Sequence, residues 1–224
     1  PLGAETSYNN VATVIAGHLT QSVRGESWYT LVKSRIYEPL GMRHSLVDPL
    51  DVPRFRVSVG DLTDPETGRM FQTTRPFLAP SFAPAGSTQM TTATDLVTFA
   101  RALIGGGTAE NGARILSASA ARLMQGPTAE FLTVGPAAKN VGLGWMILPG
   151  GVLFHGGGGP GVQSSLYAHP ASGRAAALLT NCDKGSRLMS EFLDPIVRTW
   201  TGLPAAAASQ RIEVGDPGPY VGTY

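Results

Sequence analysis

Residues 152–180 read VLFHGGGGPGVQSSLYAHPASGRAAALLT. Within this stretch, residues 162–169 and 174–180 are short runs rich in apolar and small residues, and the segment that joins them contains proline and glycine. Residues 152–155 and, further upstream, residues 141–148 have the same character. Short runs of this kind, separated by glycine- or proline-containing turns, are typical of neighbouring antiparallel strands. We therefore predict a four-stranded antiparallel sheet over residues 141–180.

Helical patterns precede and follow these strands. Apolar residues recur at helical spacing from Asn10 to a stop at Gly25, and a second helix is predicted from an N-cap at Ser27 to Pro39. Three more helices are predicted: residues 92–104, which start with a capping box and stop at a glycine triplet, residues 117–125, and an amphipathic helix containing Leu188, Phe192, Ile196 and Trp200. This order of elements, with helices first, then strands and then one packing helix, indicates an α+β fold in which helices flank an antiparallel sheet.

Two segments fall outside this regular pattern. Residues 41–90 show weak periodicity and frequent Pro, Gly, Asp and Thr, so we predict a long excursion that shapes a binding site. Residues 204–224 begin with a Pro- and Ala-rich run that is typical of a linker. We accordingly predict one main domain over residues 1–203 and a separate appendage over residues 204–224.

Composition excludes several classes of function. Apolar residues make up 42% of the 224 residues and charged residues 15%, which favours a packed core over disorder. The formal net charge of +1 gives no electrostatic reason to expect nucleic acid or an anionic membrane surface as a partner. No apolar stretch approaches the roughly 20 residues that span a bilayer. His18 and His44 are isolated from other ligand-type residues, so we expect no metal and no cofactor.

The glycine run at residues 155–161, HGGGGPG, has three possible interpretations. It matches the G-x-G-x-x-G pattern of dinucleotide sites, but those sites need a helix directly after the loop, and a strand-like segment follows here. The glycines could simply form a loose hairpin with His155 on the surface. Alternatively, they let the backbone approach a ligand and leave N–H groups free for a developing oxyanion.

Tyr8 and Asn10 stand at the start of the first predicted helix. A phenol acts as a base only where positive charge favours its ionised form, and an asparagine amide can bridge a catalytic side chain and a substrate amide. The alternative is structural: a packed tyrosine and an asparagine that caps the start of the helix. The two residues by themselves leave both interpretations open.

The order of the motifs along the chain resembles one family. Pro1-x-Gly3, Tyr8-x-Asn10 and Pro39-Leu40-Gly41-Met42 are followed by Ala85-Gly86, Thr92-x-x-Asp95-Leu96 and His155-Gly156-Gly157. This succession is similar to that of class C β-lactamases and penicillin-binding-protein-like enzymes. Their relatives include D-alanyl-D-alanine carboxypeptidases, D-amino-acid amidases or D-aminopeptidases, and β-lactamase-like esterases. The resemblance covers residues 1–202 and implies a β-lactamase/transpeptidase-like fold.

The resemblance also implies roles for individual residues. Tyr8 would be the general base or proton relay for a nucleophilic serine, and Asn10 would orient the substrate and a catalytic lysine. His155 would lie beside the Tyr8 oxygen as a donor or electrostatic partner. Gly157 and Gly158 would line the strand edge where the substrate docks, and the Gly158 N–H would be an oxyanion-hole donor.

The family's nucleophile lies in Ser-x-x-Lys, which occurs nowhere in these 224 residues. We therefore expect it before Pro1, together with the first strands of the sheet, so that the chain's own N-terminal segment becomes a required partner. The function implied is acyl-enzyme hydrolysis of an ester, a D-amino-acid amide or peptide, or a β-lactam. A catalytically inactive binding or scaffolding relative is the alternative. Residues 220–224 resemble the first strand of a lipocalin-like C-terminal barrel.

Overall fold

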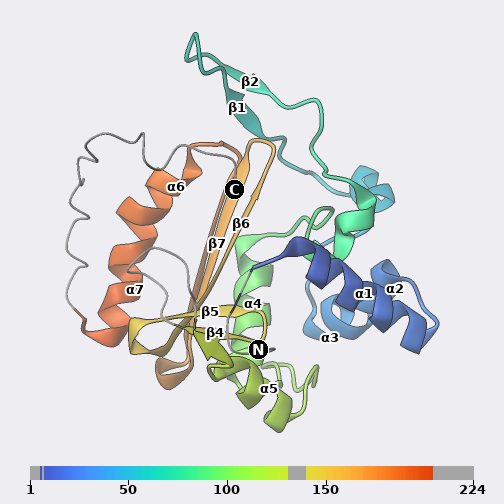
Figure 1. Cartoon of the computed structure of the whole chain (residues 1–224), viewed down its shortest axis with the longest axis vertical. Coiled ribbons are helices and arrows are strands. Elements are labelled where there is room, and N and C mark those ends of the chain that lie inside the picture. The colour runs from blue at the N-terminus through green and yellow to red at the C-terminus, as the bar shows by residue number, and fades with distance from the viewer. Residues whose placement is uncertain (1–5, 7, 131–139, 204–224) are drawn as a thin grey trace, which may run out of the picture.

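The strand-rich part of the chain forms one antiparallel sheet with the order β3-β4-β5-β6-β7-β8 (Figure 1). The computed structural model describes Thr6, residues 8–130 and residues 140–203. The strands of this sheet are β3 (Ala129–Glu130), β4 (Asn140–Gly142), β5 (Trp145–Leu148), β6 (Val152–Gly159), β7 (Val162–His169) and β8 (Arg174–Thr180). The predicted α+β class and the antiparallel topology are confirmed.

Four of the described α-helices begin at a residue whose side chain caps them. The α-helices are α1 (Asn10–Arg24), α2 (Trp28–Val32), α3 (Glu38–Leu40), α4 (Ala93–Ile104), α5 (Ala118–Gln125), α6 (Gly185–Leu188) and α7 (Asp194–Thr201). Two π-helical turns, Lys33–Tyr37 and Met189–Leu193, join α2 to α3 and α6 to α7. The predicted caps are confirmed: Ser27 and Thr92 each accept a backbone N–H at a helix start, and Gly25 ends α1 in the left-handed conformation. Ser117 caps α5 in the same way.

Two strand predictions need correction. Residues 141–148, predicted as one strand, form β4 and β5, because Gly144 adopts a φ of 83° and turns the chain back on itself. The second strand was predicted to end at His155, but β6 continues through the glycines to Gly159, in register with β7. Only Pro160 and Gly161 form the turn between them. The loose-hairpin interpretation of the glycine run is therefore wrong.

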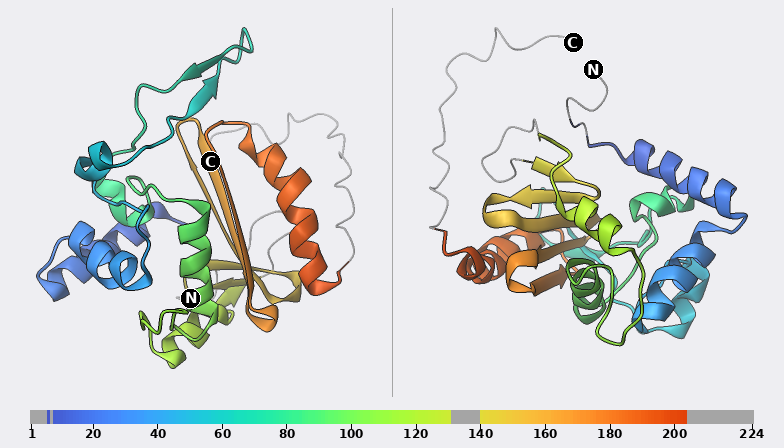
Figure 2. Two further views of the ribbon diagram at one scale, coloured as in Figure 1. Left: turned by 180° about the vertical axis from the view of Figure 1, so that it is seen from behind. Right: turned by 90° about the horizontal axis from the view of Figure 1, so that it is seen from below.

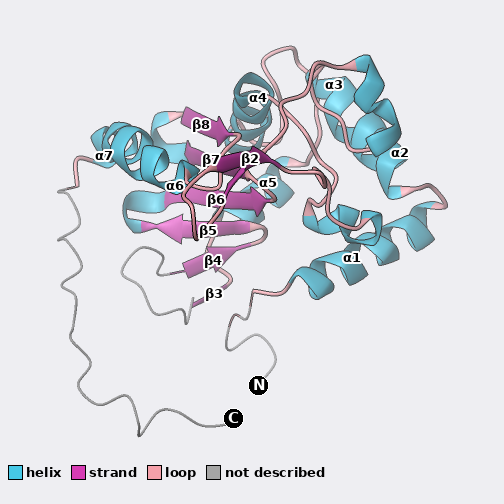
Figure 3. Ribbon diagram, turned by 90° about the horizontal axis from the view of Figure 1, so that it is seen from above, coloured by secondary structure: helices cyan, strands magenta, loops and turns pink. Residues whose placement is uncertain are grey.

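Helices cover both faces of the sheet (Figure 3). On one face, Ala100 and Leu103 of α4 pack in a buried cluster with Leu153, Leu166 and other sheet residues. On the opposite face, Leu193 and Val197 from the end of the π-turn and α7 pack against Val152 and Tyr167. Burial and a hydrogen bond to Asp194 raise the pKa of the Tyr167 phenol above its usual value. The sheet thus lies between two helical layers.

The first three helices form a separate group on the outer side of α4 (Figure 2). Val32, Leu40 and Val47 form a buried cluster with Ala102 of α4. α1 packs through its one buried residue, Gly17, where a Cβ would lie 2.4 Å from Pro84. Its larger apolar residues face outward: Val11, Ile15, Leu19 and Val23 are 54–74% exposed. The helix was predicted correctly, but the apolar stripe that predicted it does not face the described core.

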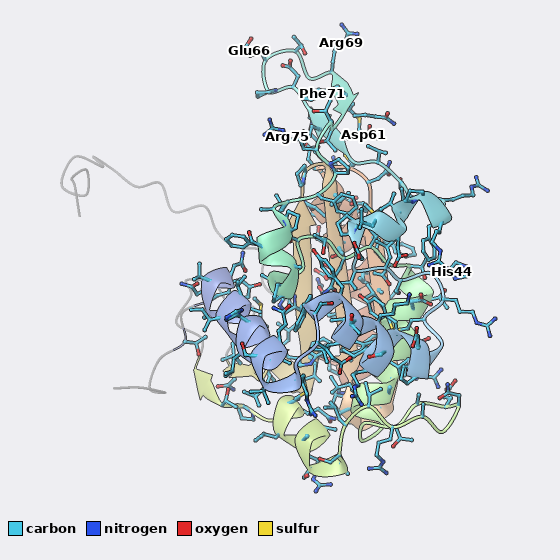
Figure 4. All side chains as sticks on the ribbon, turned by 90° about the vertical axis from the view of Figure 1, so that its right-hand side faces the viewer. His44, Asp61, Glu66, Arg69, Phe71 and Arg75 are labelled. Carbon is cyan, nitrogen blue, oxygen red and sulfur yellow. The ribbon has the colours of Figure 1, made fainter. Side chains whose placement is uncertain are left out.

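The excursion over residues 41–90 contains a hairpin that the sequence did not predict. β1 (Asp61–Thr63) pairs with β2 (Met70–Gln72), and this hairpin projects from the body beyond the β6–β7 turn (Figure 1). Figure 4 shows Glu66 and Arg69 at its far end. Its base is in close contact with that turn, since a Cβ on Gly60 would lie 2.4 Å from the Pro160 carbonyl oxygen.

Asp183 fixes the base of this hairpin. Its carboxylate accepts hydrogen bonds from the Thr63 N–H and the Thr63 hydroxyl, both at 2.8 Å, and these bonds lower the pKa of Asp183. A lowered carboxylate pKa means that this contribution to stability is complete above the ordinary aspartate range near pH 4, and is lost as pH falls through the lower folded value.

We expect Asp183→Ala to increase hydrogen exchange at the Thr63 amide several-fold at pH 7, because the variant removes both acceptors. Exchange at the Leu46 amide, which donates to the Met90 carbonyl oxygen at the other end of the excursion, is the internal control and should not change. Unchanged exchange at Thr63 would show that Asp183 does not hold the hairpin.

Several sequence predictions lie outside the described residues: Pro1-x-Gly3 and the whole 204–224 appendage, which includes the strand predicted at residues 220–224. Within the described residues, none of the helices combines the length and the apolar character that a membrane crossing requires.

Candidate active site

Tyr8 lies just before α1, and the start of that helix is fixed by Asn9. The Asn9 side-chain oxygen accepts the N–H groups of Val11 at 2.8 Å and Ala12 at 3.2 Å, so Asn9 is the N-cap. Asn10 is the first helical residue, is exposed, and makes no side-chain hydrogen bond to any described residue. The capping asparagine of the structural alternative is Asn9, and Tyr8 is 60% exposed rather than packed.

The Tyr8 ring, just before α1, lies near the His155 ring in the middle of β6. Their ring centroids are 6.2 Å apart, with the ring planes tilted by 45°. His155 is partly buried and follows Leu153, which is fully buried in the core under α4. Because alternate residues of a strand share a face, the α4 face of β6 runs from that core through His155 to Gly157. One end of this face is packed, and the other is open and holds both rings.

Beyond residue 154, β6 has a free edge in the described part of the chain. β5 pairs with β6 only through Phe154, Leu153 and Val152, whereas β7 pairs with β6 from residue 153 to residue 159. Gly157 and Gly158 belong to this one-sided segment and are exposed. An unpaired strand edge offers backbone N–H and C=O groups to an extended ligand. The structure thus brings Tyr8, His155 and the two glycines to one place.

The glycines of β6 do not serve to permit an unusual backbone, since only Gly161 of the run has a positive φ. Instead, the lack of side chains at these glycines leaves space beside the strand. A Cβ on Gly158 would meet no atom within 4 Å, whereas a Cβ on Gly157 would lie 2.6 Å from the Ser164 hydroxyl oxygen. Ser164, directly opposite on β7, was not singled out from the sequence. Ser164 can be recognised as a residue near the site only once the strand register is known, because the register places it opposite Gly157.

The Thr92-x-x-Asp95 motif is structural. Thr92 accepts the Asp95 N–H, and the buried Asp95 carboxylate accepts the His44 N–H at 2.9 Å and the Ser45 hydroxyl at 2.8 Å. Burial, with a smaller effect of Asp95, raises the pKa of Tyr37 above its usual value. These bonds join the start of the 41–90 excursion to α4 and take no part in the exposed site.

The described residues contain no group of three His, Cys, Asp or Glu side chains that could share a metal ion. The polar groups of the site are a phenol, an imidazole, an amide, a hydroxyl and free backbone groups. Such a set can accept and donate protons and can hold a carbonyl or carboxylate oxygen.

Comparison with known proteins places this arrangement in a family. Residues 1–193 match the beta-lactamase family model. The chain is 32% identical to penicillin-binding protein 4 of Amycolatopsis lactamdurans, over 97% of this chain and 59% of that protein. The chain therefore spans about three fifths of the length of that relative.

Two solved structures are similar in fold. The octameric penicillin-binding protein homologue of Pyrococcus abyssi superposes with a TM-score of 0.72 at 22% identity, covering 87% of this chain and 43% of that one. The D-amino acid amidase of Ochrobactrum anthropi SV3, complexed with L-phenylalanine amide, gives a TM-score of 0.66 at 25% identity, covering 88% and 58%. The family match over most of the chain and the fold shared with these structures lead to one conclusion: the chain belongs to the β-lactamase family of serine hydrolases.

Proposed function

We propose that this chain is part of a serine hydrolase that forms an acyl-enzyme with an ester, a D-amino-acid amide or peptide, or a β-lactam. In this proposal the nucleophilic serine and its lysine come from residues before Pro1 in the complete protein. One observation carries the proposal: the 6.2 Å separation of the Tyr8 and His155 rings beside the free edge of β6.

Each side chain then has a defined task. Tyr8 takes the proton as the serine oxygen attacks the carbonyl carbon, and the proton passes to the leaving amine or alkoxide as the acyl–heteroatom bond breaks. His155 acts beside the Tyr8 oxygen as donor or electrostatic partner. The free amide of Asn10 orients the substrate, and the edge at Gly157 and Gly158 binds its backbone-like part and the developing oxyanion. Water then attacks the acyl-enzyme and releases the acid.

The relatives support the choice of substrate class. One is a D-amino acid amidase and another is a penicillin-binding protein. A free strand edge suits an extended amide, because it can pair with the amide's own N–H and C=O groups. A histidine in the position that is lysine in many β-lactamases favours an ester or a D-amide over a β-lactam.

A panel of chromogenic substrates tests the proposal on the complete protein. We expect turnover of a short-chain p-nitrophenyl ester or a D-amino-acid p-nitroanilide, and slower or no turnover of nitrocefin. The matching L-amino-acid p-nitroanilide is the control for stereochemistry. A folded complete protein that hydrolyses none of the panel, yet still binds one of these compounds, would favour the inactive binding relative instead.

A further inference from the structure

Ser164 occupies the space that Gly157 leaves open. The two residues are directly opposite in the β6–β7 register. A Cβ on Gly157 would lie 2.6 Å from the Ser164 hydroxyl oxygen but 3.9 Å from the Ser164 Cβ. The hydroxyl therefore points from β7 toward Gly157 of β6, and in this position it has room because residue 157 has no side chain.

The hydroxyl lies on the same face of the sheet as His155. Directly paired residues of antiparallel strands share a face, as do alternate residues of one strand, so Gly157, Ser164 and His155 are on one side. This is the side on which Tyr8 approaches His155. Ser164 is only partly buried, and its hydroxyl makes no hydrogen bond with any residue in the described part of the chain.

The neighbouring Ser165 provides a contrast. It points to the opposite face, is 5% exposed, and donates its hydroxyl to the Met189 sulfur at 3.0 Å. Ser165 is therefore used within the fold, whereas Ser164 offers an unused donor at the open end of the site.

We propose that Ser164 is a substrate-binding residue, which donates a hydrogen bond from its Oγ to a carbonyl or carboxylate oxygen of a substrate lying over Gly157. The inference rests on the proposed function, because the substrate must lie along the free edge of β6. It adds a donor from β7 to a site otherwise built from β6 and the start of α1.

Kinetics of the complete protein test this role, with the p-nitrophenyl ester or D-amino-acid p-nitroanilide that it turns over best. We expect Ser164→Ala to raise KM and lower kcat/KM about 3- to 10-fold, as for loss of one neutral hydrogen bond, with kcat nearly unchanged. Ser164→Cys, which keeps the size but weakens the donor, should fall in between. Ser165→Ala is the matched control and should leave both constants within twofold of the wild type.

The position of the hydroxyl has its own test, which needs no activity. Gly157→Ala should lower the melting temperature more when it is introduced into the wild type than when it is introduced into the Ser164→Ala variant. In the wild type the added Cβ would lie 2.6 Å from the Ser164 hydroxyl oxygen, whereas without that oxygen only an ordinary 3.9 Å contact with the Cβ of residue 164 remains. Additive effects of the two changes would overturn the placement.

The outcomes separate the two proposals. A wild type that turns over its substrate, with Ser164→Ala indistinguishable from Ser165→Ala, overturns the role of Ser164 alone. A complete, folded wild type that neither turns over a substrate nor reacts with a fluorophosphonate overturns the proposed function, and the role of Ser164 with it.

Discussion

Under the proposed function, replacement of Tyr8 with phenylalanine is expected to lower kcat/KM of the complete protein roughly 100- to 10,000-fold, the usual contribution of a positioned general base. The change removes one oxygen from a side chain that is 60% exposed, so stability should hardly change. We expect the loss to fall mainly on kcat, since the phenol acts on the proton of the nucleophile. Steady-state kinetics and thermal unfolding of the same preparation measure both effects.

Tyr29→Phe is the matched control for this variant. Tyr29 lies on α2 and packs against the cluster between α2, α3 and α4, away from β6. The same loss of a hydroxyl there should leave kcat/KM within twofold of the wild type. If Tyr8→Phe did no more than Tyr29→Phe, the phenol would have no part in proton transfer.

The second large effect concerns the surfaces that the described chain leaves uncovered. We expect residues 1–224 alone to associate and to bind a hydrophobic dye, and the complete protein to do neither. The residues responsible are those of the α1 stripe, Val11, Ile15, Leu19 and Val23, and those of the α6–α7 stripe, Leu188, Phe192 and Ile196. Exposed apolar rows of this size are typical of surfaces that another segment covers. The outer edge of β8 is also unpaired among the described strands.

Burying a Leu, Ile or Phe side chain contributes roughly 1.5–3 kcal/mol. Covering three of these residues should therefore raise the melting temperature of the complete protein above that of residues 1–224 by about 10 °C or more. Ile15→Ser should lower the melting temperature of the complete protein while improving the solubility of the short chain. Leu50→Ser is the control, because Leu50 is 86% exposed and belongs to neither stripe. Equal melting temperatures for the short and complete proteins would contradict this account.

The ends of several helices and the antiparallel arrangement of the strands could be predicted from sequence, because local chemistry determines them. Ser27, Thr92 and Ser117 carry the oxygen that a helix start needs, and Gly25 provides the left-handed stop. The turn at Gly144 was missed, since Gly142 and Gly144 lie inside an otherwise apolar run that resembles one strand. The β1–β2 hairpin was missed because it is short and β2 is exposed on both faces, so it has no alternating pattern.

The strand through the glycines shows why local preference was misleading. Glycine is depleted in strands, so residues 156–159 favoured a loop by composition. Pairing with β7, closed by the tight turn at Pro160 and Gly161, overrides that preference. The packing of Phe192 was also misjudged: it belongs to an amphipathic pattern, yet 58% of its surface is exposed. Such exposure depends on which segments cover a face, and the helix's own residues do not contain that information.

The site itself followed from resemblance more than from pattern. Nothing in the local sequence says that Tyr8 meets His155, and only the order of motifs along the chain indicated it. An asparagine cap at the start of the first helix was one of two open interpretations, and the structure gives that cap to Asn9, so the Asn10 amide is not used for capping. Ser164 and Ser165 are adjacent and identical, and only the strand register separates a buried hydroxyl from an open one.

Mapping of a fluorophosphonate adduct on the complete protein tests the central claim most directly. We predict one adduct per chain, on a serine that precedes Pro1 and is followed three residues later by lysine, and slower adduct formation in Tyr8→Phe. A folded complete protein that remains unmodified, or an adduct on a serine within residues 1–224, would contradict the claim that Tyr8 and the glycine strand serve an upstream nucleophile.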